Sequence, residues 1–347
     1  MGDLYGYDAK FCDGYAFFWP ANSDNADRLS DLLNEAGCTQ VSFKAEGVLC
    51  YKAETVEAII SHLEGVSLDV RLETKILLSM DAQPELAEFI HMCCLDEFMH
   101  LASSKWLKTL LAEKRYFSLL QPIVFAETMQ IHGHEFLIRG QDVDGREISA
   151  PDLLGAAEKS GLMEKIDCAA GLSAIETSAH FNLFSKSFIN IMPRSAVGVD
   201  QNLKVWLSLI EELNIPIDTL VFEIVESEGV ADQAELRKII ETLKAKGIQI
   251  ALDDFGSGFN NITTLLDLKP NYVKLDKSLV QDIVSDAGQW NVVANLVDAA
   301  TQVGVKVIAE GVENEETMKA LMAIGVEYLQ GYFFGMPSRE PVFGFSI

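Results

Sequence analysis

Two adjacent acids, Asp253 and Asp254, end a predicted strand in the stretch IQIALDDFGSGFNN, residues 248–261. Like charges this close raise each other's pKa unless a cation lies between them. A helix cap or turn would be the structural explanation for such a sequence. A metal site at the mouth of a barrel would be the chemical explanation. The other predicted strands decide between the two.

Polar or charged residues recur at or near the ends of the predicted strands that follow the first one. They are Glu135, followed at period two by Leu137 and Arg139, then Asn190, Glu223, the Asp253–Asp254 pair, Lys274, Glu310 and Gln330. Each unpaired buried carboxylate costs on the order of several kcal/mol. A barrel lined with such acids therefore requires cations.

Carboxylate and amide oxygens favour Mg²⁺ or Mn²⁺ over Zn²⁺, which prefers His and Cys. Two such ions close together are the usual apparatus for cleaving a phosphodiester. Asp253 would bridge the ions, and Lys274 would hold the attacking water or neutralise developing charge. Arg139 would grip a substrate phosphate.

From Gln121 onward, apolar strands alternate with amphipathic helices, which indicates an α/β fold. Eight strands predict a TIM-like (β/α)8 barrel, whose chemistry lies at the carboxyl ends of its strands. The strands are expected at 122–127, 134–140, 187–192, 220–225, 248–253, 272–276, 305–310 and 327–331. A short turn around Gly133 joins the first two, so the first strand is expected to be antiparallel.

The chain before the barrel predicts a small α+β domain over residues 1–82, followed by a helical connector over 83–115 and the barrel over 116–347. Its pattern fits a ferredoxin-like βαββαβ order. The expected strands are 15–20, 39–46, 47–53 and 66–73. We expect a regulatory or dimerisation module, with its ligand or partner left open.

Composition excludes several classes. The net charge of −25 argues against a nucleic acid polymer as partner. The sequence has no apolar run long enough to span a membrane and no basic, apolar leader, so neither a membrane anchor nor secretion is expected. Six scattered cysteines without a C-x-x-C pair favour reduced thiols in the cytoplasm.

Several segments together resemble the EAL family of cyclic di-GMP phosphodiesterases, over roughly residues 100 to 340. They are QPIVFAETMQIHGHEFLIRG, FEIVESE, LDDFGSGFNN, YVKLD, IAEGVENEE and LQGYFFGMP. The resemblance implies a bacterial signalling enzyme, often a homodimer, that hydrolyses cyclic di-GMP to linear 5′-pGpG. It also implies two Mg²⁺ or Mn²⁺ ions per site and inhibition by Ca²⁺.

The family's functional residues match this sequence position by position. The implied metal ligands are Glu135, Asn190, Glu223, Asp253, Asp254 and Glu310, and the water-holding pair is Lys274 and Gln330. Gln121, Leu137 and Arg139 match its substrate contacts. Glu226 matches the carboxylate that holds the Asp-Asp-Phe-Gly loop, and Ser257 keeps the hydroxyl that it would bind.

Three departures from the family pattern stand out. Phe136 replaces the signature alanine, and alternation points it away from the site. Met192 replaces a usual serine after Asn190. Asn260 and Asn261 replace two serines of a loop that also contributes to dimer contacts.

Two other functions are open. In the first, the chain is a catalytically weak or inactive cyclic di-GMP receptor that signals through its N-terminal domain. Receptors of this kind usually lose the signature Glu, the Asp pair or the Lys, whereas this chain keeps all of them. An unrelated metal-dependent barrel with an enolising site would share the acids and Lys274. It would not explain Gln121, Arg139 or the Gln-Gly-Tyr ending.

Overall fold

The computed structural model describes residues 14–344 apart from 54, 64, 104, 193–195, 225–232 and 257–261. Its contacts divide the chain into two units. The first comprises residues 1–109 and 155–162, and the second comprises residues 110–154 and 163–347. The predicted three-part division at 82 and 115, with a separate helical connector, stays a prediction.

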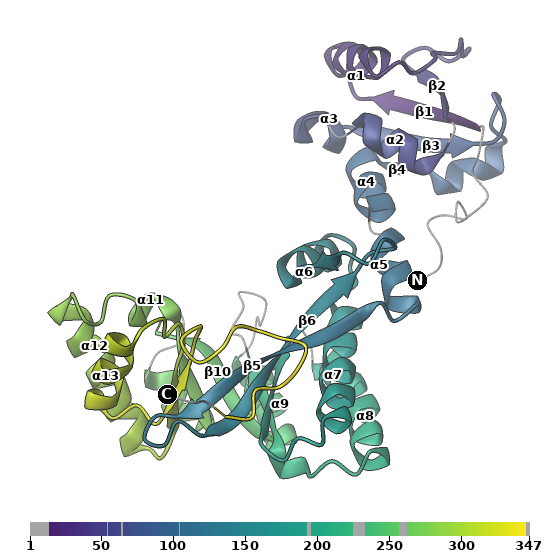
Figure 1. The fold of residues 1–347 in the computed structure, drawn as a ribbon. Coiled ribbons are helices and arrows are strands. Elements are labelled where there is room, and N and C mark those ends of the chain that lie inside the picture. Colours follow the sequence, from purple (N-terminus) through teal and green to yellow (C-terminus); the bar gives the residue numbers. More distant parts are fainter. Residues whose placement is uncertain are drawn as a thin grey trace. The chain divides into compact units, whose positions relative to one another are not determined.

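The first unit is a small α+β domain with an antiparallel sheet in the order β2-β1-β3-β4. Its elements are β1 (Gly14–Pro20), α1 (Ser23–Glu35), β2 (Leu49–Ala53), α2 (Val56–Leu63), α3 (Leu68–Leu72), β3 (Thr74–Ser79), the 3₁₀ helix η2 (Leu86–His91), β4 (Cys93–Cys94) and α4 (Leu95–Ser103) (Figure 1). The helix α5 (Lys105–Ala112) follows, and α6 (Ala150–Lys159) contributes its second half.

Alternation along the strands gives this sheet two apolar faces. Ala16 and Phe18 of β1 pack with helices α1, α2 and α4 on one face. Phe17 of β1 packs on the other face with Phe89 of η2 and with Phe43 of the loop that leads into β2. The predicted small α+β domain is therefore confirmed.

Two of its predicted strands were placed wrongly. Within residues 66–73 the structure has the helix α3 at Leu68–Leu72 instead of a strand. Val66 and Val70, four residues apart, are buried, whereas Leu68 and Leu72 are more than half exposed. The strand of this region is β3 (Thr74–Ser79), which is buried on both faces and therefore lacks an alternation of apolar and polar residues. The strand expected at 39–46 is reduced to a single bridge between Gln40 and Tyr51.

The second unit is a closed barrel of eight strands among the described residues, in the order β5-β13-β12-β11-β10-β9-β8-β6, closed by β5–β6 pairing. These strands are β5 (Tyr116–Phe125), β6 (Ile131–Gln141), β8 (Lys186–Ile191), β9 (Leu220–Ile224), β10 (Gln249–Phe255), β11 (Tyr272–Leu275), β12 (Lys306–Ala309) and β13 (Tyr328–Gln330). The short β7 (Glu147–Ile148) pairs with β6.

Helices follow the strands and cover the barrel. They are α7 (Met163–His180), α8 (Ala196–Glu212), η3 (Ile217–Thr219), α9 (Gln233–Ala245), α10 (Ile262–Leu268), α11 (Lys277–Val280), α12 (Ala287–Gln302) and α13 (Glu315–Ile324). One apolar cluster fills the space between strands and helices and includes Leu120, Ile189, Trp206 and Phe222.

The antiparallel first strand is confirmed, since β5 runs against both β6 and β13 (Figure 1). The turn that joins β5 and β6 lies at residues 126–130, not at Gly133. Gly133 lies inside β6, where a Cβ atom would be 2.5 Å from the Lys186 carbonyl oxygen. This glycine allows β6 and β8 to approach.

Aromatic side chains fill the amino-terminal end of the barrel. His132 lies with its ring centroid 4.2 Å from that of Tyr328, and its Nε2 is 3.2 Å from the Tyr272 hydroxyl. Phe188 and Phe125 pack around them. Burial lowers the pKa of His132 to about 3, so the ring is neutral. The predicted site residues lie toward the opposite, carboxyl end of the barrel.

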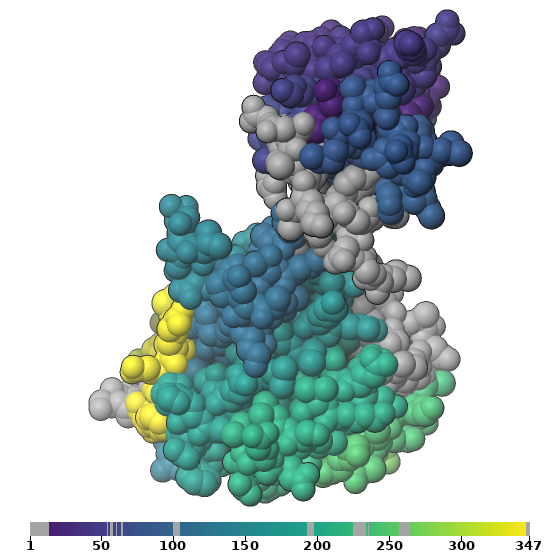
Figure 2. All heavy atoms as spheres, turned by 90° about the vertical axis from the view of Figure 1, so that its right-hand side faces the viewer, coloured from purple at the N-terminus to yellow at the C-terminus, as the bar shows by residue number. Residues whose placement is uncertain are grey.

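The C-terminal segment, yellow in Figure 2, lies on the surface of the barrel unit. Ser338 pairs with Leu120 of β5, and the Arg339 guanidinium lies 3.6 Å from the Phe117 ring centroid. His134 Nε2 donates to the Val342 carbonyl oxygen at 3.0 Å. No helix in the described ranges is long and apolar enough to cross a membrane.

Candidate active site

A buried lysine stands among four carboxylates at the carboxyl end of the barrel. Lys274 Nζ lies 3.2 Å from Glu135, 3.0 Å from Glu223, 3.5 Å from Asp253 and 2.5 Å from Glu310. These side chains come from β6, β9, β10, β11 and the residue after β12, and alternation turns them all inward. Lys274 is 1% exposed and Glu223 is fully buried.

The four carboxylates keep the ammonium charged. Burial alone would lower the pKa of Lys274, but attraction to Asp253, Glu135, Glu223 and Glu310 outweighs it and raises the pKa well above its usual range. One ammonium nevertheless faces four carboxyl groups. The excess negative charge must be met by protons or by further cations.

The carboxyl groups divide into ionised and proton-holding members. Burial, and repulsion from Glu135, raise the pKa of Glu223 well above its usual value. Burial raises the pKa of Glu310 to about 8, although Lys274 opposes the shift. Burial also acts on Glu135, but Lys274 and two amide hydrogen bonds outweigh it and lower its pKa. Among these three glutamates, Glu135 is therefore the one whose charged form is favoured.

The two amide donors to Glu135 are predicted site residues. Asn190 Nδ2 donates to one carboxylate oxygen at 3.0 Å, and Gln330 Nε2 donates to the other at 2.7 Å. Gln330 Nε2 also lies 3.3 Å from Gln121 Oε1 on β5. Four strands, β5, β6, β8 and β13, are therefore tied together at this point.

A bulge in β10 separates the two adjacent acids. The β10–β11 register shifts between Leu252 and Phe255, and Asp254 takes a left-handed φ of 52°, which is unfavourable for a residue other than glycine. Without a bulge, neighbouring strand residues would face opposite sides. Asp253 reaches Lys274, and burial and repulsion from Asp253 raise the pKa of Asp254.

The oxygen donors suit a hard divalent cation in type. Glu223 Oε2 is buried and accepts no hydrogen bond from the described part of the chain, so it has a free coordination position. The described residues contain no group of three His, Cys, Asp or Glu side chains already converging as a metal site. Lys274 lies between the carboxylates instead.

A cavity of about 170 Å³ lies next to this cluster, between the ends of β5, β6, β12 and β13. Gln121, Glu135, Glu310 and Gln330 contribute from the predicted set. Gly331 also lines it, and a Cβ atom there would lie 2.1 Å from the Val312 carbonyl oxygen. Only glycine allows the chain after Gln330 to pass this close.

Three further residues line this cavity that the sequence analysis did not assign to the site, namely Lys277, Glu313 and Tyr332. Lys277 Nζ pairs with Glu313 at 2.9 Å. Its stem crosses Gly311, where a Cβ atom would be 2.6 Å from Lys277 Cγ. Lys277 could have been identified from the sequence, because it directly follows the YVKLD strand and so lies at the carboxyl end of that strand.

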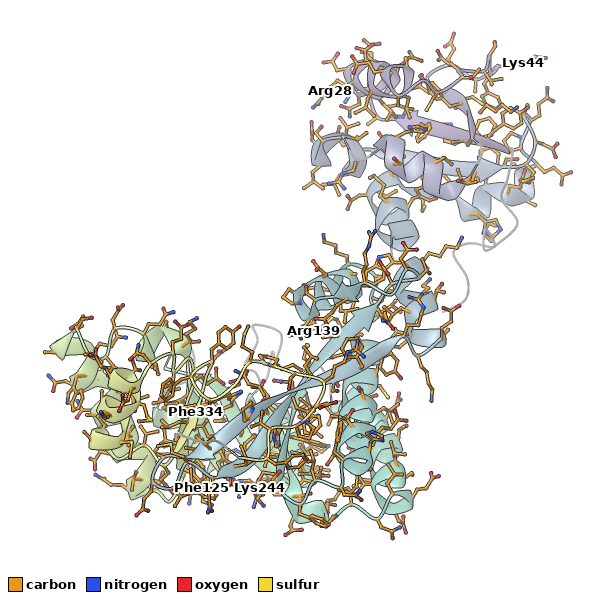
Figure 3. The ribbon with its side chains drawn as sticks, in the orientation of Figure 1. Arg28, Lys44, Phe125, Arg139, Lys244 and Phe334 are labelled. Carbon is orange, nitrogen blue, oxygen red and sulfur yellow. The ribbon has the colours of Figure 1, made fainter. Side chains whose placement is uncertain are left out.

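Arg139 and Leu137 lie farther along β6 and do not join the Lys274 cluster. Arg139 Nε pairs with Glu147 of β7 at 3.3 Å, and the opposite residue on β5 is Phe117. Figure 3 shows Arg139 and Phe125 toward opposite ends of the β5–β6 hairpin. Leu137 is half-buried. A substrate contact at Arg139 requires exchange of its Glu147 partner.

The departures from the family pattern fall partly in the described residues. Phe136 is buried with Ile175 of α7, away from the lumen as alternation predicts. The Met192 amide donates to Asp167 at 3.0 Å. Glu226, Ser257, Asn260 and Asn261 lie outside the described residues.

Comparison with known proteins gives the family. The EAL domain matches residues 104–337. The chain is 29% identical over 238 residues to the cyclic di-GMP phosphodiesterase PdeF of Escherichia coli, covering 67% of this chain and 31% of PdeF. It is 27% identical over 248 residues to PdeL of the same organism, covering 70% and 68%. This chain therefore spans less than a third of PdeF.

Solved structures agree. A standalone EAL protein from Vibrio cholerae bound to c-di-GMP is 30% identical, with a TM-score of 0.57 over 64% of this chain and 94% of that one. The EAL domain of FimX from Pseudomonas aeruginosa, also bound to c-di-GMP, is 26% identical, with a TM-score of 0.62 over 69% and 98%. The EAL domain match covers more than half of the chain, and so the chain belongs to the EAL-domain family.

Proposed function

We propose that the barrel hydrolyses cyclic di-GMP to linear 5′-pGpG and so lowers the level of this second messenger. The observation that carries the proposal is the Lys274 ammonium among Glu135, Glu223, Asp253 and Glu310, beside a cavity at the carboxyl end of the barrel. The names of the relatives PdeF and PdeL and the nucleotide bound in two similar structures support the substrate.

We propose two Mg²⁺ or Mn²⁺ ions per site, held by Glu135, Asn190, Glu223, Asp253, Asp254 and Glu310. The excess of carboxylates over cationic groups and the free position on Glu223 Oε2 support this ligand set. When bound, such ions polarise the phosphate and lower the pKa of a water molecule. Ca²⁺ is expected to inhibit, because it takes more ligands at longer distances.

The reaction adds one water to one phosphodiester. A water oxygen forms a bond to phosphorus, the bond from phosphorus to the 3′ oxygen breaks, and the released 3′ hydroxyl takes a proton. A carboxylate of the cluster accepts the proton that the attacking water loses. Lys274 orients the attacking water and offsets negative charge on the phosphate as it develops, aided by its buried surroundings.

Gln330 and Gln121 extend this arrangement to the substrate. Gln330 holds Glu135 in place through a 2.7 Å hydrogen bond, and Gln121 borders the cavity. Leu137 would pack against a guanine, and Arg139 would bind a phosphate after leaving Glu147. Glu226 would hold the loop that contains Ser257.

The remaining assignments concern the whole protein. We propose that the protein is a homodimer. We also propose that it is cytoplasmic, because the five cysteines among the described residues are free thiols. The N-terminal unit would regulate the barrel or its dimerisation.

The deciding experiment incubates the full chain with cyclic di-GMP and Mg²⁺ or Mn²⁺ and separates the nucleotides. Glu135→Ala is compared with Glu113→Ala, which removes an exposed carboxylate that pairs with Arg115. Linear pGpG formed by the native chain and Glu113→Ala, but not by Glu135→Ala, supports the enzyme. If the chain binds cyclic di-GMP but does not hydrolyse it, the chain is a receptor. If it neither binds nor hydrolyses the nucleotide, both the enzyme and the receptor proposals are refuted.

A further inference from the structure

We propose that Asp167 of α7 is a positioning residue, which fixes the carboxyl end of β8 and thereby holds Asn190 in place for metal binding. The proposal rests on the function proposed above, in which Asn190 is a ligand of the metal site. Asp167 is not among the described residues that line the cavity beside Lys274, so it acts through the strand.

The strand β8 runs out of pairing partners just past Asn190. Its described pairing with β6 reaches Ile189, and its pairing with β9 reaches Ile191. The next amide, that of Met192, donates instead to Asp167 Oδ1 at 3.0 Å. A side chain of α7 therefore continues the hydrogen bonding of β8 at the point where strand pairing stops.

Asp167 is itself held firmly. It is 5% exposed, and its second oxygen accepts a hydrogen bond of 3.0 Å from Asn202 Nδ2 of α8. The same Nδ2 lies 3.3 Å from the Glu164 carbonyl oxygen of α7. One carboxylate thus ties two helices to the end of one strand.

This arrangement costs stability. Burial raises the pKa of Asp167 to about 7, because the carboxylate has left water, although two hydrogen bonds oppose the shift. An apolar side chain would fill the same space without this cost. Local choices that oppose stability are typical of residues that serve a functional site.

The strand end passes the position of Met192 on to Asn190. The two residues are two positions apart, so their side chains lie on the same face of β8. Asn190 Nδ2 donates to Glu135 Oε1 at 3.0 Å and so belongs to the Lys274 cluster. A metal ligand must be held within about 0.5 Å of its productive position. Loss of the Asp167 anchor would therefore be felt at Asn190.

The other end of β8 offers a matched control. Ser178 of α7 and Ser187 of β8 share a buried hydrogen bond of 3.1 Å, and both are at most 1% exposed. This bond also joins α7 to β8, but it lies toward the amino-terminal end of the strand, away from Asn190. Ser178→Ala should therefore lower stability without affecting the metal site.

The test measures Mn²⁺ binding to the full chain without nucleotide, by electron paramagnetic resonance of the free ion. KM and kcat for cyclic di-GMP are measured at saturating Mn²⁺, and circular dichroism melting identifies the folded variants. The variants are Asp167→Ala, Asp167→Asn, Asn202→Ala and Ser178→Ala. Asparagine keeps an acceptor for the Met192 amide, and Asn202 can turn its carbonyl oxygen toward the new amide group.

We expect Asp167→Ala to bind Mn²⁺ about 10-fold more weakly and to lose about 10-fold in kcat, at the lower end of effects from residues that support metal ligands. KM should stay within about 2-fold, because Asp167 acts on the metal site and not on the substrate. Asp167→Asn should restore Mn²⁺ affinity to within about 3-fold of native. Asn202→Ala should weaken Mn²⁺ binding about 3-fold, and it decides if Asp167→Ala does not fold.

Three results would overturn the proposal. They are native Mn²⁺ affinity in the deciding variant, an equal loss of affinity in Ser178→Ala, and no recovery in Asp167→Asn. A native chain that binds Mn²⁺ but forms no pGpG would refute the hydrolysis alone, and the Mn²⁺ affinities would still decide the role of Asp167. A native chain that does not bind Mn²⁺ would refute both.

Discussion

Lys274 Nζ lies 3.0 Å from Glu223 Oε1, and both side chains are almost completely removed from solvent. This contact is the innermost of four between the lysine and carboxylates of neighbouring strands. It makes the barrel's stability and its proposed chemistry depend on the same group.

Lys274→Met should lower both stability and activity. The substitution keeps the apolar stem but leaves buried carboxylates without their cation, which typically costs about 3–5 kcal/mol. Urea unfolding measures this loss, and pGpG formation should disappear. Adding Glu135→Gln, which removes the carboxylate whose charged form the site favours, should recover part of the stability without activity. A double variant no more stable than Lys274→Met would contradict this reading of the pair.

Asp254→Asn should raise stability and lower activity. Asparagine tolerates the left-handed φ of 52° better than aspartate, and the change removes a charge beside Asp253. We expect a gain of about 1 kcal/mol in urea unfolding and at least a 10-fold loss of turnover, on the order of one oxygen ligand's contribution. Lys269→Asn is the control, because Lys269 also has a positive φ, of 44°, but lies outside the site. Equal activity loss in both variants would argue against a role for Asp254.

Gly331→Ala should disrupt the site through the backbone. The new Cβ atom would lie 2.1 Å from the Val312 carbonyl oxygen, so the segment after Gln330 must shift. The free energy of unfolding should fall by about 2 kcal/mol or more, and turnover should fall with it. Gly155→Ala is the contrast, since a Cβ atom in this helical position meets nothing within 4 Å. It should gain up to about 1 kcal/mol.

Glu147→Gln should make Arg139 more available to a phosphate. Their 3.3 Å ion pair competes with substrate if Arg139 binds it as proposed. We expect a KM for cyclic di-GMP that is a few-fold lower with kcat unchanged, whereas Arg139→Lys should raise KM about 10-fold through loss of the guanidinium fork. An unchanged KM in both variants would remove Arg139 from the substrate site. Glu113→Gln, at another Arg–Glu surface pair, is the control.

Asp167 should make stability fall as pH rises. Burial raises its pKa from 3.8 to about 7, against hydrogen bonds from the Met192 amide and Asn202 Nδ2. Between about pH 4 and 7 the folded state therefore binds more protons than the unfolded state, and the free energy of unfolding decreases with pH. The effect is at most about 4 kcal/mol.

The measurement compares urea unfolding at several pH values for the native chain and Asp167→Asn. The difference in stability between native and variant should shrink or reverse as pH rises through this window. Glu211→Gln, which removes an exposed carboxylate on α8, should follow the native chain. A native and an Asp167→Asn curve that stay parallel would rule out titration of Asp167.

Local periodicity was enough for much of this molecule. The barrel strands and their order follow from apolar runs alternating with amphipathic helices, and Lys274, Glu135 and Glu223 were identifiable because acids and a lysine inside such strands have no cheap structural explanation. The same local reasoning misplaced the strand at 66–73. The apolar residues at every second position there lie in or just before the helix α3, and only two of the four, Val66 and Val70, are buried.

The fold class and the kinds of side chains that line the barrel can be predicted without coordinates, because strand alternation is a local property. Three features became visible only in the folded chain: Lys274 lies between four carboxylates, Asp254 has a left-handed φ at a bulge, and Lys277 reaches the cavity rim. Such features depend on distances between residues far apart in the chain, which are fixed only when strands pair and side chains pack.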